Sequence, residues 1–397
     1  MIQITDKERC CGCGACQQIC PKQCITMVSD QEGFLYPQAN PTLCIECDLC
    51  SKVCPIINPN PTTRPINTYA VRNRSNETCA QSSSGGIFSL IAEGVLADGG
   101  VVFGAGFNDS WDVEHYSIDS LDKLHKLRSS KYVQSNTLGC FKEAKEHLSN
   151  GHKVLFTGTP CQIAGLKHYL RNDFENLIAV EVVCHGTPSP KIWQEYLAYR
   201  LAKIRLSDPQ HPNPTITDIE FRDKSTGWEG YSFRLDYKAE PLAQITHTER
   251  EPYMENIYMQ GFLKNLYLRP SCHHCQAREG RSGADITLGD YWGLAQHHPE
   301  IFSDLGVSVV MANTPKGERV FNAISPKCHF VLSSFDSAIA TNPCIVTSVA
   351  TPPRRAEFWE AYDNRGIEAI AEFCQQAKSH SFKQRLKRLW HKLSGNK

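Results

Sequence analysis

The sequence has no excess of either charge. Its 42 lysine and arginine residues balance 42 aspartate and glutamate residues, so no overall positive field attracts nucleic acid and no nucleic-acid partner is expected. With 41% apolar and 21% charged residues, the composition is that of a folded chain rather than a disordered one. A length of 397 residues gives room for two or three domains.

Long apolar runs are also missing. The most apolar stretch, residues 87–102, is interrupted by Glu93, Asp98 and glycines, whereas a membrane-spanning helix needs about 20 apolar residues. The first residues, Met-Ile-Gln-Ile-Thr-Asp-Lys-Glu-Arg, lack the apolar segment of a secretory signal. The sequence therefore predicts a cytoplasmic protein.

Cysteine, in contrast, is abundant, with 19 residues. Disulfide scaffolds are typical of short secreted chains, so these thiols are better explained as metal ligands or catalytic groups. Eight of them repeat one spacing, C-x2-C-x2-C-x3-C-P. They are Cys10, Cys13, Cys16 and Cys20, then Cys44, Cys47, Cys50 and Cys54.

The repeated spacing predicts two [4Fe–4S] clusters. Three thiolates on a tight loop can cap three irons of a cubane, and in two-cluster ferredoxins the fourth thiolate of each run binds the other cluster. We therefore assign Cys54 to the cluster of the first run and Cys20 to the cluster of the second. Gly12 and Gly14 suit the close backbone approach that N–H donation to sulfur requires.

A pair of zinc sites in an interaction protein is the alternative interpretation. Zinc needs only four ligands, however, and would leave each C-x2-C-x2-C triplet over-supplied. Cys11 and Cys24 lie off the repeated spacing and are expected to bind no metal.

A proline-rich segment, residues 57–66, separates this ferredoxin-like region from a larger domain. In that domain, apolar strands are expected over residues 153–157 and 177–183, with a helix between them. A strand–helix–strand unit of this length is usually parallel and right-handed. Cys161 and Cys184 then follow neighbouring strands at the carboxyl edge of the sheet, where open α/β folds bind ligands. We expect these two cysteines to be neighbours in space.

A further pair, Cys272 and Cys275, lies in an arginine-rich loop. Together with Cys161 and Cys184 it offers the four thiolates of a third [4Fe–4S] cluster. Spacing alone leaves a second interpretation open, in which Cys161 and Cys184 are buried apolar thiols and the C-x2-C is a small zinc or redox motif. The cysteines without a partner pattern are expected to be core or surface thiols: Cys79, Cys140, Cys328, Cys344 and Cys374.

Six motifs occur in order along the larger domain: SSSGGIF at residues 82–88, KYVQS at 131–135, GTPCQ at 158–162, CHGTPSP at 184–190, the C-x2-C at 272–275 and ADITLGDYWG at 284–293. Together they resemble the family of coenzyme F420 hydrogenase/dehydrogenase beta subunits. The resemblance covers most of residues 68–350, and the double ferredoxin run is similar to that of the F420H2-dehydrogenase-like members. It implies a flavoprotein that binds FAD beside a third [4Fe–4S] cluster. Because the family also includes members that do not use F420, the organic substrate stays open.

The serine–glycine loop, residues 82–86, is the first candidate flavin contact. It precedes an expected helix, so hydroxyls, N–H groups and the helix N-terminus converge on an anion such as a pyrophosphate. A serine-rich helix cap without a ligand is the alternative. The candidate residues in this loop are Ser83, Ser84, Gly85 and Gly86.

The strand end Thr157, Gly158 and Thr159 is a second candidate for phosphate or ring contacts. Lys131, in the KYVQS motif, is a candidate charge near the pyrimidine end of the ring. Three further residues near the same sheet edge are candidate proton carriers: His185, Asp285 and Asp290.

These features predict an α+β ferredoxin-like domain over residues 1–62, a larger α/β domain with a mixed, partly parallel sheet over residues 68–350, and a helical extension over residues 351–397. We expect an iron–sulfur flavoprotein oxidoreductase that exchanges electrons between a small-molecule two-electron partner and ferredoxin or another redox protein. An electron-transfer subunit without its own substrate is the alternative. Residues 381–397 are basic and amphipathic, which fits a helix packed on the domain or peripheral contact with the inner face of the membrane.

Overall fold

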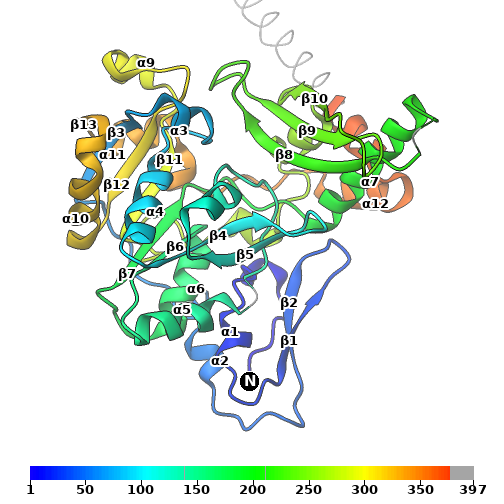
Figure 1. Ribbon diagram of the computed structural model, residues 1–397. Helices are drawn as coiled ribbons and strands as arrows, with labels where there is room; N and C mark the ends of the chain where they lie inside the picture. The colour runs from blue at the N-terminus through cyan, green and yellow to red at the C-terminus, as the bar shows by residue number, and fades with distance from the viewer. Residues whose placement is uncertain (138, 211, 376–397) are drawn as a thin grey trace, which may run out of the picture.

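The computed structural model describes residues 1–137, 139–210 and 212–375 (Figure 1). Its largest sheet has eight strands in the order β13-β3-β12-β11-β7-β6-β4-β5. In chain order these strands are β3 (Asn67–Asn73), β4 (Val101–Phe107), β5 (Val113–Ile118), β6 (Val154–Gly158), β7 (Leu177–Val182), β11 (Ile286–Asp290), β12 (Ser308–Ala312) and β13 (Cys328–Ser333). The four central strands, β4, β6, β7 and β11, are parallel to one another. The other four strands, β5, β12, β3 and β13, join the sheet by antiparallel pairing. The prediction of a mixed, partly parallel sheet is confirmed.

Helices cover both faces of this sheet. α4 (Ile87–Ala97) and α10 (Pro315–Ile324) share an apolar core with one face. α5 (Cys140–Ser149) and α6 (Pro160–Leu170) pack on the other. Successive residues of a strand point to opposite faces, and β6 accordingly contributes Val154 and Phe156 to the α5/α6 core and Leu155 to the other. This explains why β6 is a continuous apolar run.

The ferredoxin-like region contains α1 (Ala15–Gln18), α2 (Leu49–Lys52) and a two-stranded sheet of β1 (Ile25–Ser29) and β2 (Leu35–Ala39). It lies beneath α5 and α6 in Figure 1. Cys13 and Ala15 belong to the same buried core as Phe141 and Ile163. The region is therefore packed directly against the large sheet's helices.

A third sheet, β10-β9-β8, lies beside the large sheet at the upper right of Figure 1. It consists of β8 (Thr215–Asp223), β9 (Ser232–Lys238) and β10 (His247–Pro252). It shares a core with α7 (Pro190–Ser207), α8 (Ile257–Leu263) and α12 (Arg355–Arg365). The remaining helices are the short α3 (Asn76–Ala80), α9 (Leu294–His297) and α11 (Phe335–Thr341), and the 3-10 turn η3 (Pro270–His274) carries Cys272.

Among the described residues, no helix is both long and apolar enough to cross a bilayer. The basic segment 381–397, on which the suggestion of membrane contact depends, lies outside the described residues.

Candidate cofactor site

The eight N-terminal cysteines fall into two sets that line two separate hollows. Group I consists of Cys10, Cys13, Cys16 and Cys54. Group II consists of Cys20, Cys44, Cys47 and Cys50. Each set joins three cysteines of one run to the last cysteine of the other, which is the crossed arrangement that the spacing predicts.

Burial and the neighbouring thiols raise the pKa of two group I cysteines, Cys16 and Cys54. Burial raises the pKa of Cys16 to about 12, and the neighbouring charges of Cys10 and Cys54 add to this effect. Iron binding relieves such crowding, because a metal binds the thiolate form and releases the proton. Donor type and grouping therefore fit iron–sulfur clusters.

The two off-pattern cysteines lie closer to the predicted ligands than expected. The Cys24 sulfur is 3.4 Å from the sulfur of Cys20. Cys11 lines the same hollow as group I, and its thiol and that of Cys161 of the large domain shift each other's pKa. Their positions follow from chain folding, and the spacing gave no signal of them.

The four cysteines predicted for a third cluster also come together, and we call them group III. Cys161 is the second residue of α6, Cys184 follows β7, and Cys272 and Cys275 lie in and directly after η3. Burial raises the pKa of the Cys184 thiol well above its usual value, and three neighbouring thiols raise it further, those of Cys161, Cys272 and Cys275. β6 and β7 pair in parallel, as expected, so both strand ends lie at the same edge of the sheet.

Across residues 1–137, 139–210 and 212–375, no three His, Cys, Asp or Glu side chains converge closely enough to hold a single metal ion. A cubane is wider than one ion, because each of its four thiolates binds a different iron. In group III, the backbone N–H of Thr187 already points at the sulfur of Cys272, at 3.4 Å. Such N–H donors are typical of iron–sulfur sites.

A cavity of about 280 Å³ opens beside group III, at the carboxyl edge of the parallel strands. Its size approaches that of sites for small organic ligands. Among the residues that line it are Cys184 and nine of the predicted site residues: Ser83, Ser84, Gly86, Lys131, Thr157, Gly158, Thr159, His185 and Asp290. The structure thus gathers both predicted flavin segments around one space.

Gly85 does not line this cavity, and its role is packing. A Cβ at Gly85 would lie 2.5 Å from the carbonyl oxygen of Val71, and its N–H donates to Ser308 Oγ at 3.0 Å. The loop therefore sits tightly on the sheet and presents its neighbouring serines to the cavity.

Ser83 and Ser84 differ in their partners. The Ser83 hydroxyl accepts a hydrogen bond from the backbone N–H of Ser130 at 2.8 Å. The Ser84 hydroxyl is buried and has no hydrogen-bond partner within the described part of the chain. Because a buried hydroxyl is normally satisfied, the Ser84 hydroxyl is an exception among the described side chains that line the cavity.

Lys131 is held inside the cavity wall. Its ammonium donates to the carbonyl oxygens of Lys126, Arg128 and Ser129 at 3.1, 2.5 and 3.3 Å. Burial lowers the pKa of Lys131 to about 7. The side chain can therefore carry or release a proton near neutral pH.

Two cations that the sequence did not single out reach the same loop from the third sheet. Arg222, 1% exposed, donates to the carbonyl oxygen of Ser83 at 3.3 Å and forms an ion pair with Asp290 at 2.8 Å. The ammonium of Lys224 donates to the carbonyl oxygen of Ser84 at 3.1 Å. A basic residue in a strand or directly after it gives no sequence signal of such a position.

The three candidate proton carriers have different fates. His185 lines the cavity, its Nε2 lies 2.7 Å from Asn265 Oδ1, and burial lowers its pKa. Asp290 also lines the cavity, but Arg222 neutralises it. Asp285 precedes β11 and lies at the opposite, amino edge, where its carboxylate accepts from the N–H of Ala179 and the hydroxyl of Thr314.

A chain of buried hydrogen bonds holds the end of β6 in place. His115 Nε2 lies 2.9 Å from the carbonyl oxygen of Thr157, and its Nδ1 lies 2.9 Å from Ser135 Oγ. Gln162 donates to Ser135 Oγ and accepts from the N–H of Thr159. Burial lowers the pKa of His115 to about 4, so the imidazole is neutral. Sequence analysis missed His115, although its partner Ser135 and the Gln162 that donates to Ser135 belong to two of the quoted motifs.

Both the ferredoxin-like region and the large domain match known protein families. Residues 9–56 match the 4Fe-4S dicluster domain family, and residues 151–338 match the family described as the C terminus of the coenzyme F420 hydrogenase/dehydrogenase beta subunit. A subunit of the F(420)H(2) dehydrogenase of Methanosarcina mazei is 21% identical over 334 residues, which is 82% of this chain and 84% of that protein.

Two other relatives are more distant or only partly covered. The coenzyme F420-dependent sulfite reductase of Methanocaldococcus jannaschii is 24% identical over 347 residues, and the match covers 82% of this chain and 47% of that protein. A chain of the F420-reducing [NiFe] hydrogenase complex from Methanosarcina barkeri superposes with a TM-score of 0.44 at 17% identity, covering 80% of this chain and 94% of that one.

Proposed function

We propose that this chain is a flavin-dependent iron–sulfur oxidoreductase. Its residues 151–338 belong to the family of coenzyme F420 hydrogenase/dehydrogenase beta subunits, and its residues 9–56 belong to the 4Fe-4S dicluster domains. It passes electrons between a two-electron organic partner, an F420-like deazaflavin or another reducible small molecule, and ferredoxin-type clusters. The observation that carries the proposal is the cavity, because seven of the eight residues predicted to hold FAD and the group III cysteine Cys184 line the same space.

The cavity wall fits the phosphate end of FAD. The 11-residue helix α4 begins directly after the serine–glycine loop, and helix N-termini attract anions. The unpartnered hydroxyl of Ser84 and the ammonium of Lys131 supply a donor and a positive charge. A flavin bound here would accept or donate electrons in pairs with an organic partner and singly with iron–sulfur centres.

Group III is proposed as the ligand set of a third [4Fe–4S] cluster. Its four thiols converge from three chain segments, and the N–H of Thr187 is already directed at one of the sulfurs. Since Cys184 also lines the cavity, such a cluster would adjoin the ligand without an intervening layer of protein.

The chain's own groups can manage protons at this site. His185 is neutral at pH 7 because burial lowers its pKa, and Asn265 fixes its ring. Lys131, whose pKa burial lowers to about 7, can release a proton at the same pH. Asp290 is paired with Arg222 and is assigned a positioning role, and Asp285 faces the other edge of the sheet and takes no part.

Anaerobic purification tests the proposal directly. About twelve irons with matching acid-labile sulfide and one FAD per chain are expected for three cubanes and one flavin. The sample should then oxidise reduced F420, or another two-electron donor, with a one-electron dye as acceptor. Zinc without iron or flavin would overturn the proposal.

A second candidate function is an electron-transfer subunit without a substrate of its own. One observation favours it, since the Methanosarcina mazei relative is named as a subunit of a dehydrogenase. In that case the purified chain would contain the same cofactors and accept electrons from dithionite, but no small molecule would turn over until a partner protein is added.

A further inference from the structure

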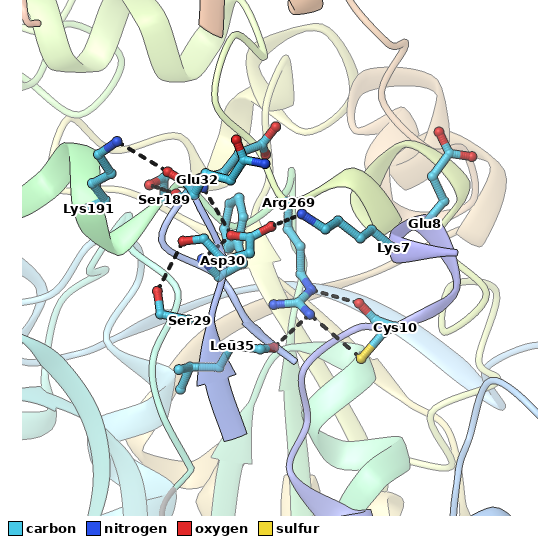
Figure 2. A network of polar contacts seen from close by, with 12 residues as sticks. Lys7, Glu8, Cys10, Ser29, Asp30, Glu32, Leu35, Ser189, Lys191 and Arg269 are labelled. Atoms are coloured by element: carbon cyan, nitrogen blue, oxygen red, sulfur yellow. Dashed lines mark hydrogen bonds and ion pairs between the residues drawn. The ribbon is translucent and has the colours of Figure 1, made fainter. Parts of the chain in front are cut away.

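The guanidinium of Arg269 reaches from the large domain into the ferredoxin-like region (Figure 2). Its backbone belongs to the large domain, because its N–H donates to the carbonyl oxygen of Thr187 at 3.0 Å and Leu268 pairs with Pro188. The side chain is 1% exposed. Arg269 is therefore a buried charge at the junction of the two regions.

Every nitrogen of the guanidinium is used. Nε donates to the carbonyl oxygen of Cys10 at 2.7 Å, and Nη1 donates to Gln134 Oε1 at 3.0 Å. Nη2 donates to the carbonyl oxygen of Leu35 at 2.9 Å and lies 3.6 Å from the sulfur of Cys10. The guanidinium also stacks over the ring of Tyr36 at 4.3 Å. Its position against the group I cysteine Cys10 is thus fixed from four sides.

No carboxylate is among these partners in the part of the chain that the structure describes. The nearby acids of Figure 2 are already engaged: Asp30 pairs with Lys7 at 2.6 Å, and Glu32 pairs with Arg355. A buried charge without a counter-charge is costly. In place of a carboxylate, the guanidinium lies against the Cys10 sulfur, at 3.6 Å, and against whatever Cys10 binds.

The cysteine loop is shaped to admit this side chain. Gly12 has a φ of +71°, and a Cβ there would lie 2.7 Å from Arg269 Nη1 and 2.9 Å from Gln134 Nε2. Any other residue at position 12 would push the guanidinium away from Cys10. The predicted need for glycine beside the cluster is thus partly a need for space for Arg269.

Arg269 also adjoins group III. Its carbonyl oxygen accepts a hydrogen bond from the N–H of Cys272 at 2.9 Å, so it begins the turn that carries this cysteine. One residue therefore contacts a ligand of group I with its side chain and a ligand of group III with its backbone.

We propose that Arg269 raises the midpoint potential of the group I cluster relative to the group II cluster, and so makes group I the first acceptor of electrons that leave the large domain. Reduction adds negative charge to a cluster, and a fixed, buried positive charge favours the reduced state; charge and hydrogen bonds at the sulfurs are established determinants of cluster potential. The basic residues that line the two N-terminal hollows, Arg9 and Lys22, are exposed, so water and salt screen them.

Redox titration followed by EPR tests this proposal in the full-length, cluster-loaded protein. R269Q removes the charge, R269K keeps it, and R9Q removes an exposed charge beside the same hollow. A fourth variant, Q134E, leaves Arg269 in place and neutralises it, because position 134 already contacts Nη1. The group I signal is identified as the one that Cys10→Ser perturbs, and iron content is measured for each variant.

R269Q and Q134E are expected to shift the group I potential to more negative values, by about 59 mV for each tenfold loss in the equilibrium constant of a one-electron reduction. The group II potential should move less, and R269K and R9Q should stay near the wild-type values. The shift should persist at high salt because the charge is buried. If R269Q loses iron, the potentials of Q134E alone test the proposal. Unchanged potentials in iron-replete Q134E, or equal shifts at both clusters, would overturn the proposal. Since the N-terminal clusters alone are measured, the result is independent of whether the cavity binds FAD.

Discussion

The N-terminal cysteines and the group III cysteines are brought together by opposite structural routes. Groups I and II lie within residues 10–54, where each triplet occupies one tight loop and only the fourth cysteine crosses over. Group III draws on the ends of two parallel strands and a distant 3-10 turn. The first arrangement is local to a short motif, whereas the second exists only when the large sheet has formed.

The difference also separates what each part can do. The N-terminal hollows are small and enclosed by their own loops, so they suit clusters and little else. Group III adjoins a cavity of about 280 Å³, because the carboxyl edge of a parallel sheet leaves open space between loops. Under the proposed function, storage of electrons and contact with an organic ligand would take place in different parts of the fold.

The largest expected effect is the loss of a whole cluster from the sheet-built site alone. Cys272→Ser should lower the iron content from about twelve to about eight atoms per chain, because the motif-built groups do not depend on this residue. Iron and acid-labile sulfide analysis measures the change. Cys344→Ser is the control: Cys344 lies 3.7 Å from His185 Nδ1 beside the same site and outside the predicted ligand set. Equal iron content in C272S and the wild type would contradict the prediction that group III binds a cluster.

The crossed ligands offer the next sharpest test of the motif-built region. Cys20→Ser should perturb the EPR signal of the group II cluster, although Cys20 belongs to the first cysteine run. Cys24→Ser should leave both signals unchanged, even though its sulfur lies only 3.4 Å from that of Cys20. A C20S variant that changes the group I signal instead would show that each run binds its own cluster.

Sequence reasoning was most successful where the signal is local. The repeated cysteine spacing identified both N-terminal groups, and the apolar runs on either side of Cys161 identified β6 and β7 and hence the approach of Cys161 to Cys184. Parallel pairing follows from the strand–helix–strand pattern, so this part of the tertiary structure was also within reach.

What sequence reasoning missed depends on contacts between distant segments. Arg222 reaches the serine–glycine loop from the third sheet, His115 supports Thr157 from a neighbouring strand, and Arg269 crosses to Cys10. None of these residues lies in a motif whose spacing reveals its partner. The prediction that Asp285 lies near the cavity was wrong. Asp285 precedes β11 and so lies at the amino edge of the sheet, whereas the cavity opens at the carboxyl edge.

A charge effect at the cavity is expected to be intermediate in size. Lys131→Met should weaken FAD binding about ten- to a hundredfold at pH 6, because it removes a positive charge from the cavity wall, and such a charge near an anion contributes roughly 1–3 kcal/mol. Burial lowers the pKa of Lys131 to about 7, so the ammonium is charged below that pH and loses its proton above it. Wild-type affinity should therefore fall as the pH rises from about 6 to about 8.5.

Fluorescence titration of flavin-free protein at several pH values measures this dependence. K131M should show no such fall, whereas the exposed neighbour Lys126 gives a matched control, K126M, that should behave like the wild type. A pH-independent wild-type affinity would remove Lys131 from the flavin site.

The smallest effect separates two adjacent serines. Ser84→Ala should raise the FAD dissociation constant about two- to tenfold, the range of one neutral hydrogen bond, and should leave the melting temperature of the flavin-free protein unchanged, because the Ser84 hydroxyl has no partner to lose among the described residues. Ser83→Ala should lower the melting temperature of the flavin-free protein and change the FAD dissociation constant less. The Ser83 hydroxyl accepts a hydrogen bond from the N–H of Ser130, and its removal leaves that donor unsatisfied. If S84A destabilised the flavin-free protein as much as S83A, the Ser84 hydroxyl would serve the fold and not a ligand.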